Sequence, residues 1–300
     1  MKELLVISGK GGTGKTSVVG AFATLARNAV LADCDVDAAN LHLLLDPEIQ
    51  HEHVFHGLPR AQIDQATCAS CGLCREVCRF DAISSDYVVD PMACEGCGIC
   101  LRVCPVDAIT AQERVAGHWF VSTTPHGPLV HARLNTAEDN SGKLVAEVRR
   151  EARELAEERQ LDLIIVDGPP GIGCPVISAL TGTDLALLVT EPSVSGWHDL
   201  ARALELTEHF EVRTVVCINK ADLHEPMSKQ IEWHCYDRGV DVIGRIPFDK
   251  QLAQAAVRGT APVLGDTPAS TALRKLWEKT HALLMQDSSR NPRPLRLDTR

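Results

Sequence analysis

The chain has 300 residues, of which 45% are hydrophobic and only 4% aromatic, so we expect an aliphatic core, as buried parallel sheets have. A formal net charge of −10 argues against binding to nucleic acid or to anionic lipid. Met1-Lys2-Glu3 leads straight into an apolar stretch, without the pattern of a signal peptide. Every apolar run is shorter than the roughly 18 residues of a membrane span, so we predict a cytoplasmic protein.

Strands and helices are predicted to alternate along most of the chain. The predicted strands are Leu4–Ser8, Ala29–Ala32, Trp119–Ser122, Leu129–Ala132, Leu163–Val166, Leu185–Val189, Thr214–Ile218 and Val242–Ile246. Strands Trp119–Ser122 and Leu129–Ala132 should form a hairpin that turns at Gly127-Pro128. The predicted helices are Thr16–Arg27, Lys143–Glu158 and a C-terminal apolar stripe through Leu273, Leu276, Trp277, Leu283 and Leu284. This alternation favours an α/β fold with a parallel sheet covered on both faces.

An insertion interrupts this pattern. From about His51 to Gln65 the chain turns polar, and we predict an irregular connection there, with His51, His53 and His56 in an ordinary loop. Cysteines then cluster between Thr67 and Thr110. We therefore divide the chain into a nucleotide-binding domain at 1–60 and 113–300 and an inserted domain at 61–112. The Ser-, Asn-, Pro- and Arg-rich residues 287–300 are predicted to be a disordered tail.

A phosphate-binding loop follows the first predicted strand. Gly9-Lys10-Gly11-Gly12-Thr13-Gly14-Lys15-Thr16 fits G-x-x-x-x-G-K-[ST] between a strand and a helix. Backbone N–H groups and the helix N-terminus would hold the phosphates. Lys15 would bind the β- and γ-phosphates, and the Thr16 hydroxyl would bind Mg²⁺. The predicted nucleotide contacts are Gly9, Gly11, Gly12, Thr13, Gly14, Thr16 and Ser17.

Lys10 gives this loop a more specific form. The loop resembles the deviant Walker A motif, G-K-G-G-x-G-K-T, of the MinD/ParA ATPases, whose relatives include the Mrp-type Fe–S ATPases and the nitrogenase iron protein. The resemblance covers nearly the whole chain outside the cysteine insertion. It implies a MinD-like α/β fold and a nucleotide-dependent homodimer. In that dimer Lys10 would reach the phosphates bound by the partner, as an arginine finger does.

The resemblance also implies roles for three aspartates. Asp33-Cys34-Asp35 is similar to the family's switch I element, so Asp35 would orient the attacking water or lie near Mg²⁺, and Asp33 would support it. Leu161–Gly173 resembles Walker B followed by switch II, with Asp167 at the strand end beside Mg²⁺. We therefore assign catalytic roles to Lys10, Lys15, Asp33, Asp35 and Asp167.

The sequence is compatible with either of two nucleotide bases, adenine or guanine. Asn219-Lys220-Ala221-Asp222 matches the N-K-x-D of guanine-specific GTPases literally. In MinD-like proteins, however, the Asn of a similar stretch contacts adenine, and Ile246–Asp249 with Pro247 resembles the loop that packs on the base. The Walker A type leads us to predict ATP, with GTP as the alternative.

The cysteine insertion contains two runs of the pattern C-x₂-C-x₂-C-x₃-C. This is the spacing of two-cluster bacterial ferredoxins, in which the fourth cysteine of each run binds the other cluster. We predict two [4Fe–4S] clusters, one bound by Cys68, Cys71, Cys74 and Cys104, the other by Cys94, Cys97, Cys100 and Cys78. Structural zinc would leave half of these thiols idle, and disulfides would need an oxidising compartment. One departure is Arg79, which follows Cys78 where the second run has Pro105.

The four remaining cysteines are outside these runs. Cys34, Cys217 and Cys235 are predicted core residues. Cys174 stands seven residues after Asp167, an offset that resembles a cluster ligand of the nitrogenase iron protein, but a buried position against switch II is the simpler expectation. Asn140 is a predicted helix cap.

Two functions fit these motifs. In the first, ATP gates electron transfer through the clusters to a redox partner. In the second, the protein is an Mrp-like maturation factor that carries a cluster to a client protein. A positioning ATPase that binds DNA or membrane is disfavoured by the charge.

Overall fold

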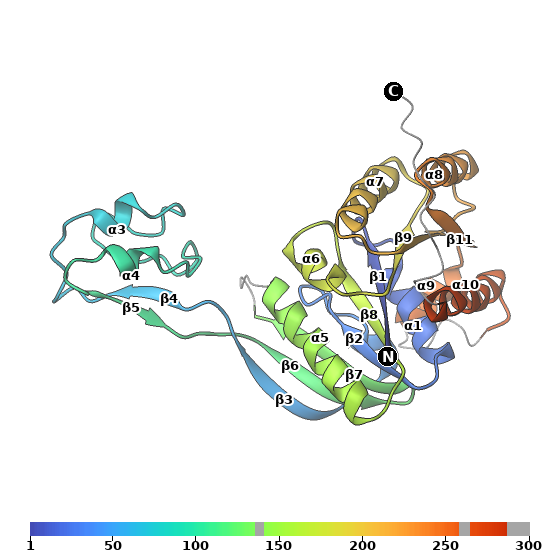
Figure 1. Cartoon of the computed structure of the whole chain (residues 1–300), viewed down its shortest axis with the longest axis horizontal. Coiled ribbons are helices and arrows are strands. Elements are labelled where there is room, and N and C mark those ends of the chain that lie inside the picture. The colour runs from blue at the N-terminus through green and yellow to red at the C-terminus, as the bar shows by residue number, and fades with distance from the viewer. Residues whose placement is uncertain (136–140, 258–264, 287–300) are drawn as a thin grey trace.

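The computed structural model describes residues 1–135, 141–257 and 265–286. They form a sheet-and-helix core and a small lobe, which stands away from the core at the end of a two-stranded arm (Figure 1). None of the helices in these ranges is long and apolar enough to cross a bilayer. The predicted cap Asn140 and the predicted tail lie outside the described residues.

The core is built on one large sheet. Within the described residues its spatial order is β11 (Asp241–Ile246), β10 (Thr214–Asn219), β9 (Leu185–Thr190), β1 (Lys2–Ser8), β8 (Leu163–Pro170), β2 (Ala29–Asp33), β7 (Gly127–Leu134), β6 (Val115–Thr124) and β3 (Glu48–His56). The strands from β11 to β7 pair in parallel, whereas β6 is antiparallel to β7 and to β3. The predicted α/β fold with a mostly parallel sheet is confirmed.

Helices cover both faces of this sheet, because its central strands are apolar on both sides. One face packs against α5 (Ser141–Glu158), α6 (Cys174–Leu180), α7 (Val194–His209) and α8 (Glu225–Asp237). The other packs against α1 (Lys15–Leu25), the short α2 (His42–Leu45) and α10 (Pro268–Met285). A further helix, α9 (Lys250–Val257), follows β11. The predicted C-terminal stripe lies on α10, where Leu273, Leu276 and Leu284 are buried.

Beyond the end of β3 and before the start of β6, the chain forms the arm that leads to the lobe (Figure 1). Strands β3 and β6 themselves pair with each other at the edge of the sheet. Their register shifts between Ile49 and His51 and again between Phe55 and His56. Near the second shift, Lys143 of α5 donates from Nζ to the His56 carbonyl at 3.3 Å and lies 5.6 Å from the centre of the Phe55 ring. The arm is therefore attached to α5 close to where it leaves the core.

The lobe consists of β4 (Arg60–Ile63), β5 (Ile109–Gln112), α3 (Leu73–Glu76) and α4 (Ile99–Val103). Its two halves repeat each other in structure as well as in sequence. Ala82-Ile83 in the first half and Ala108-Ile109 in the second are buried alike, each Ala 2% and each Ile 7% exposed. Gly96 packs against the end of the arm, since a Cβ there would lie 2.6 Å from the Pro59 carbonyl oxygen.

Two expectations about local structure are wrong. The stretch from His51 to Gln65 is not irregular, because His51, His53 and His56 lie on β3 and β4 follows it. The predicted hairpin exists, but its strands join at residues 125–126, and Gly127-Pro128 begins β7 instead of forming the turn. Both errors concern strands at or near the sheet edge, where polar residues are tolerated and alternation is weak.

Candidate functional site

The phosphate-binding loop lies at the centre of the sheet. It leaves the carboxyl end of β1, between β8 and β9, and leads into α1, the position where α/β proteins bind ligands. Gly14 has φ 91°, and a Cβ there would collide with the Asn219 side chain, so only glycine fits. Thr16 and Ser17 are half-buried in the first turn of α1.

Lys15 is held at the centre of a group of carboxylates. Its Nζ lies 2.5 Å from Asp167 Oδ1 and 3.3 Å from Asp35 Oδ2, and its side chain is 6% exposed. Burial opposes the charged ammonium, but the charges of Asp167 and Asp35 outweigh burial and raise the pKa of Lys15. The lysine is therefore charged and already paired before any phosphate binds.

Asp33 supports this group from the end of β2. Its fully buried carboxylate accepts hydrogen bonds from the backbone N–H groups of Asp35 at 3.1 Å and Leu41 at 3.0 Å, which shape the switch I turn. Burial and the charge of Asp167 raise its pKa to about 8, against the opposing effect of Lys15. Asp33 thus contacts the backbone, and Asp35 and Asp167 contact the cation.

The carboxylates also provide a test for Mg²⁺. The carboxylates of Asp35 and Asp167 outnumber the single ammonium of Lys15, so the group has an excess of negative charge even with Asp33 protonated. Asp167 Oδ2 is buried and has no hydrogen-bond partner. A hard divalent cation prefers oxygen ligands and would satisfy both features. Asp167 and the Thr16 hydroxyl are the side chains that would hold it.

Lys10 points away from this group. Its Nζ lies 2.7 Å from Glu191 Oε1, 2.8 Å from Ser195 Oγ and 3.2 Å from Ser193 Oγ, all at the junction of β9 and α7. The preceding residue, Gly9, packs so closely on α7 that a Cβ would lie 2.5 Å from the Asp199 backbone. The two lysines of one loop therefore have separate carboxylate partners within this chain.

The residues predicted to contact the base brace the loop instead in this state. Asn219 donates from Nδ2 to the Thr13 carbonyl at 2.7 Å, and Lys220 donates to the Gly12 carbonyl at 3.1 Å. Asp222 Oδ1 accepts from the backbone N–H of Phe248 at 2.6 Å, so the loop that contains Pro247 is tied to the end of β10. The structure thus brings Asn219 and Lys220 beside the phosphate loop and joins the Pro247 loop to Asp222.

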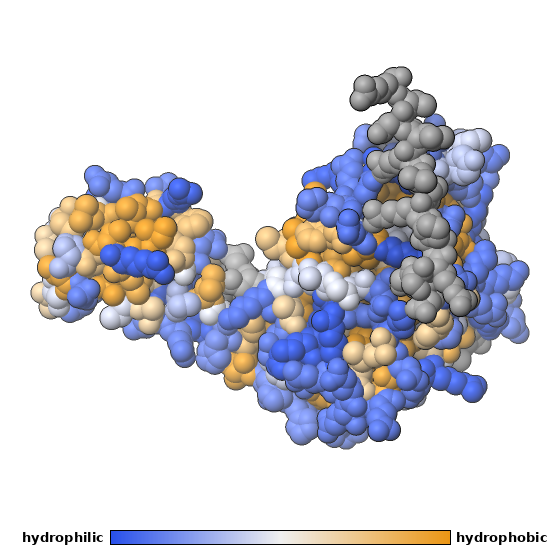
Figure 2. Space-filling model, viewed as in Figure 1, coloured by the Kyte–Doolittle hydropathy of each residue, from blue (hydrophilic) through white to orange (hydrophobic). Residues whose placement is uncertain are grey.

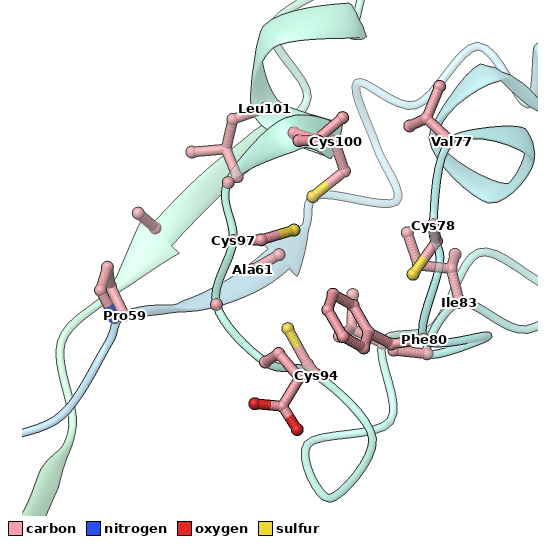
Figure 3. Close-up of a pocket in the computed structure, with 17 residues that line it drawn as sticks. Pro59, Ala61, Val77, Cys78, Phe80, Ile83, Cys94, Cys97, Cys100 and Leu101 are labelled. Atoms are coloured by element: carbon pink, nitrogen blue, oxygen red, sulfur yellow. The ribbon is translucent and has the colours of Figure 1, made fainter. Parts of the chain in front are cut away.

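The eight cysteines of the two runs line two cavities in the lobe. Cys68, Cys71, Cys74 and Cys104 line one cavity, which we call cavity one. Cys78, Cys94, Cys97 and Cys100 line another, cavity two, with their sulfur atoms directed into it (Figure 3). Each run thus places three cysteines in one cavity and its fourth in the other.

The donor set fits a bound iron–sulfur group better than a single ion. Within the described residues, no three Cys, His, Asp or Glu side chains are arranged closely enough to hold one metal ion. The thiols instead surround spaces that are otherwise lined mainly by apolar residues. The Ala108 N–H donates to Cys104 Sγ at 3.3 Å, a contact of the kind that tunes iron–sulfur clusters. Four thiols around one apolar space suit such a cluster.

The other cysteines divide as follows. Cys34, Cys217 and Cys235 are buried, as expected. The expectation that Cys174 is buried is wrong, because it is exposed at the first position of α6, opposite Gly142 at the start of α5. The helix begins beyond the carboxyl end of β8, past the strands of the sheet, so its first residue is not covered.

Glu191 and Lys220 are contacts of the phosphate loop to which the sequence analysis assigned no role. Both follow the carboxyl ends of parallel strands, β9 and β10, where charged side chains of such folds gather. Applied to the predicted strand Leu185–Val189, this rule would have identified Glu191 from the sequence.

These features define an α/β nucleotide-binding protein of the P-loop type. A family model described as the CobQ/CobB/MinD/ParA nucleotide binding domain matches residues 4–263. The chain belongs to this family.

Individual proteins support this assignment. An uncharacterized protein of Methanocaldococcus jannaschii is 33% identical over 92% of this chain and 95% of its own length. A protein of Pyrococcus furiosus named iron-sulfur cluster carrier protein is 30% identical, over 40% of this chain and 45% of that protein. The septum site-determining protein MinD of Pyrococcus horikoshii, solved with Mg-ADP, has a TM-score of 0.58 at 18% identity and covers 94% of this chain and 96% of its own, which shows a shared fold.

Proposed function

We propose that this protein is a Mg²⁺-dependent ATPase whose nucleotide state controls electron transfer through two [4Fe–4S] clusters. The observation that carries the proposal is the pair of cavities, each lined by three cysteines of one run and the fourth of the other. Residues 61–112 would be the ferredoxin-like domain, inserted into an ATPase domain at 1–60 and 113–300. A redox protein would be the partner that receives or supplies the electrons.

In the nucleotide site, Mg·ATP would replace internal contacts. Lys15 would exchange the Asp35 and Asp167 carboxylates for the β- and γ-phosphates. Asp167 and Thr16 would hold Mg²⁺, which neutralises phosphate charge when bound. Asp35, released from Lys15, would orient the attacking water, while Asp33 keeps the switch I backbone in place.

Hydrolysis in this proposal needs two protomers. Lys10 of the partner subunit would stabilise the charge that develops on the transferred phosphoryl group, as an arginine finger does. The γ-phosphate would then hold switch I (Asp33–Asn40) and switch II (Asp167–Gly173) in the closed state until it leaves. Switch I leads through α2 into the arm, so its position could influence the lobe.

A bound iron–sulfur cluster accepts and releases single electrons. This chain would supply eight thiolates and the apolar surroundings that separate the clusters from water. Burial raises the pKa of the Cys74 and Cys100 thiols, so these side chains stay protonated until metal binds.

The second candidate is a cluster carrier. Two observations favour it: a relative that bears the name iron-sulfur cluster carrier protein, and the exposed Cys174 next to switch II. A cluster carrier must release its cluster to a client protein, whereas an electron-transfer protein must keep its clusters.

The distinguishing experiment uses anaerobically purified protein with about eight Fe and eight sulfide per chain, as two four-iron clusters require. The ATP dissociation constant is measured in the dithionite-reduced and the oxidised protein. Iron is then counted after ATP turnover with an apo-ferredoxin acceptor.

A relay predicts that iron is retained and that the two dissociation constants differ, because coupling between sites is reciprocal. A coupling of about 1.4 kcal/mol would appear as a tenfold difference. Transfer of iron to the acceptor with identical dissociation constants would favour the carrier. Zinc in place of iron would contradict both candidates.

A further inference from the structure

Lys10 has no donor left for a phosphate in this conformation. A lysine ammonium has three N–H donors, and three oxygen atoms surround this one, from Glu191, Ser193 and Ser195. All three acceptors belong to the same protomer, at the junction of β9 and α7. Before Lys10 can reach a second protomer, it must give up these contacts.

Glu191 is itself held from the opposite side. Its Oε2 lies 2.8 Å from Lys220 Nζ, which also donates to the Gly12 carbonyl of the phosphate loop. The Glu191 side chain is 19% exposed. Burial alone would raise its pKa, but hydrogen bonds from Lys10 and Lys220 outweigh burial and lower it, so the carboxylate is charged at neutral pH.

We propose that Glu191 is a positioning residue that holds Lys10 within its own protomer and thereby opposes dimerisation until ATP is bound. The inference rests on the proposed role of Lys10 in the dimer. When two ATP-loaded protomers meet, the phosphates of one compete with Glu191 of the other for the same ammonium. The triphosphate has more negative charge than the diphosphate at the position that Lys10 must reach, so the exchange favours ATP over ADP.

The arrangement differs from that of Lys15. Lys15 is 6% exposed and can meet phosphate without leaving its own site, whereas Lys10 is 26% exposed and must swing away from α7. Because the Lys10 pair is partly hydrated, its exchange costs less than breaking a buried ion pair. Glu191 would therefore adjust the threshold for dimerisation without preventing it.

The test measures the dimer dissociation constant of the anaerobic holoprotein by sedimentation, with Mg·ATP and with Mg·ADP. Glu191→Gln should tighten the ATP dimer about fivefold and produce a measurable ADP dimer. Ser195→Ala removes one acceptor of Lys10 without touching Lys220, so it should tighten the dimer about twofold and leave the ATP affinity of the monomer unchanged. A purely structural disturbance would change that monomer affinity.

Lys10→Ala separates this inference from the proposed function. If Lys10→Ala dimerises with ATP as the unaltered protein does, the proposed role of Lys10 is wrong. If Lys10→Ala abolishes the dimer but Glu191→Gln and Ser195→Ala leave its dissociation constant unchanged or weaken it, the proposed role stands and Glu191 does not hold Lys10 back.

Discussion

In the core, buried Leu, Ile and Val side chains pack on both faces of the sheet, whereas in the lobe the buried aliphatic positions are Ile63, Ile83 and Ile109, with small residues beside them. Figure 2 shows a broad hydrophobic area on the visible face of the lobe. The large apolar side chains that the lobe exposes include Leu73, Phe80, Val88, Met92, Ile99 and Val106. Domains this small rarely fold on apolar burial alone and often need metal. The core therefore contains its own source of stability, whereas we expect the lobe to depend on a group bound by its cysteines.

The largest expected effect is the loss of the lobe when iron is removed. Chelation of the anaerobic protein should abolish amide protection throughout residues 61–112, while amides of β1 and β8 stay protected, because the core does not depend on the cysteines. Hydrogen exchange read by mass spectrometry measures both regions in one sample. If the amides of β4 and β5 stay protected after complete iron loss, the lobe folds without iron and does not differ from the core in this respect.

Replacing the fourth cysteine of one run should remove the cluster that is bound mainly by the other run. Cys104→Ser should remove the cluster of cavity one, leaving about four Fe per chain. Cys78→Ser is the matched variant and should remove the cluster of cavity two. EPR of the reduced proteins distinguishes the signals of the two clusters. Each variant should keep the signal that the other variant loses. If both variants lose the same signal, the two cavities do not hold separate clusters.

Within the core, Arg149 offers a test of buried charge. It lies 2.7 Å from Glu3 Oε1 and also donates to the Ser178 and Thr181 carbonyls, with 4% of the residue exposed. Arg149→Met should lower the free energy of unfolding of the core by about 3 kcal/mol, the low end of the range for a broken buried pair, because the buried Glu3 keeps only the partly exposed Arg153 as a cation.

Arg150→Met is the control on the same helix. Arg150 pairs with Glu147 and Glu154 in solvent, where such pairs contribute less than about 1 kcal/mol. Urea unfolding followed by circular dichroism measures the free energy of unfolding of both variants. Equal losses of stability would contradict a special contribution of the buried Arg149–Glu3 pair. Neither variant should change the iron content of the lobe.

The smallest expected effect is a pH dependence of the core. His131 is buried on β7 with its Nε2 3.0 Å from Ser122 Oγ, and burial together with the neighbouring His42 lowers its pKa to about 4. Because the folded-state pKa of His131 is lower than its unfolded-state pKa of about 6.5, the unfolded chain takes up the proton first as the pH falls. The contribution of neutral His131 to stability is therefore complete above pH 6.5 and is lost as the pH falls toward 4. The loss should reach about 3 kcal/mol at pH 4.

Ser122→Ala combined with His131→Phe removes both polar partners of this pair together. Urea unfolding from pH 7.5 to pH 4 should then show a smaller decline than in the unaltered protein. An identical decline would assign the acid sensitivity to other groups, such as the carboxylates around Lys15.

The elements that the sequence predicted well are those whose residues determine them locally. Helix α5 was placed to within two residues because its apolar stripe has a clear helical period. The phosphate loop is found from one contiguous motif. Strand β3 was missed because it lies at the sheet edge with only Phe55 buried, so no alternation of apolar and polar residues marks it.

Contacts between distant residues explain most of what the sequence could not give. The pairing of Lys10 with Glu191 joins the first strand–helix connection to one far along the chain, and no motif links the two. The bracing of the phosphate loop by Asn219 likewise appears only when β10 takes its place two strands from β1. The division of the eight cysteines into two sets could be predicted from the sequence, because in two-cluster ferredoxins with this spacing the fourth cysteine of each run binds the other cluster.

The arm has a mechanical consequence. The arm leaves the core at His56, where Lys143 joins it to α5, and reaches Pro59, which contacts Gly96 beside cavity two, three residues later. At about 3.3 Å per residue this segment is roughly 10 Å long, and a register shift, where strands bend, lies at its base. A tilt of about 10° at the base would move the far end of this segment by about 2 Å. A displacement too small to disturb the sheet could thus decide whether that end of the lobe reaches another protein.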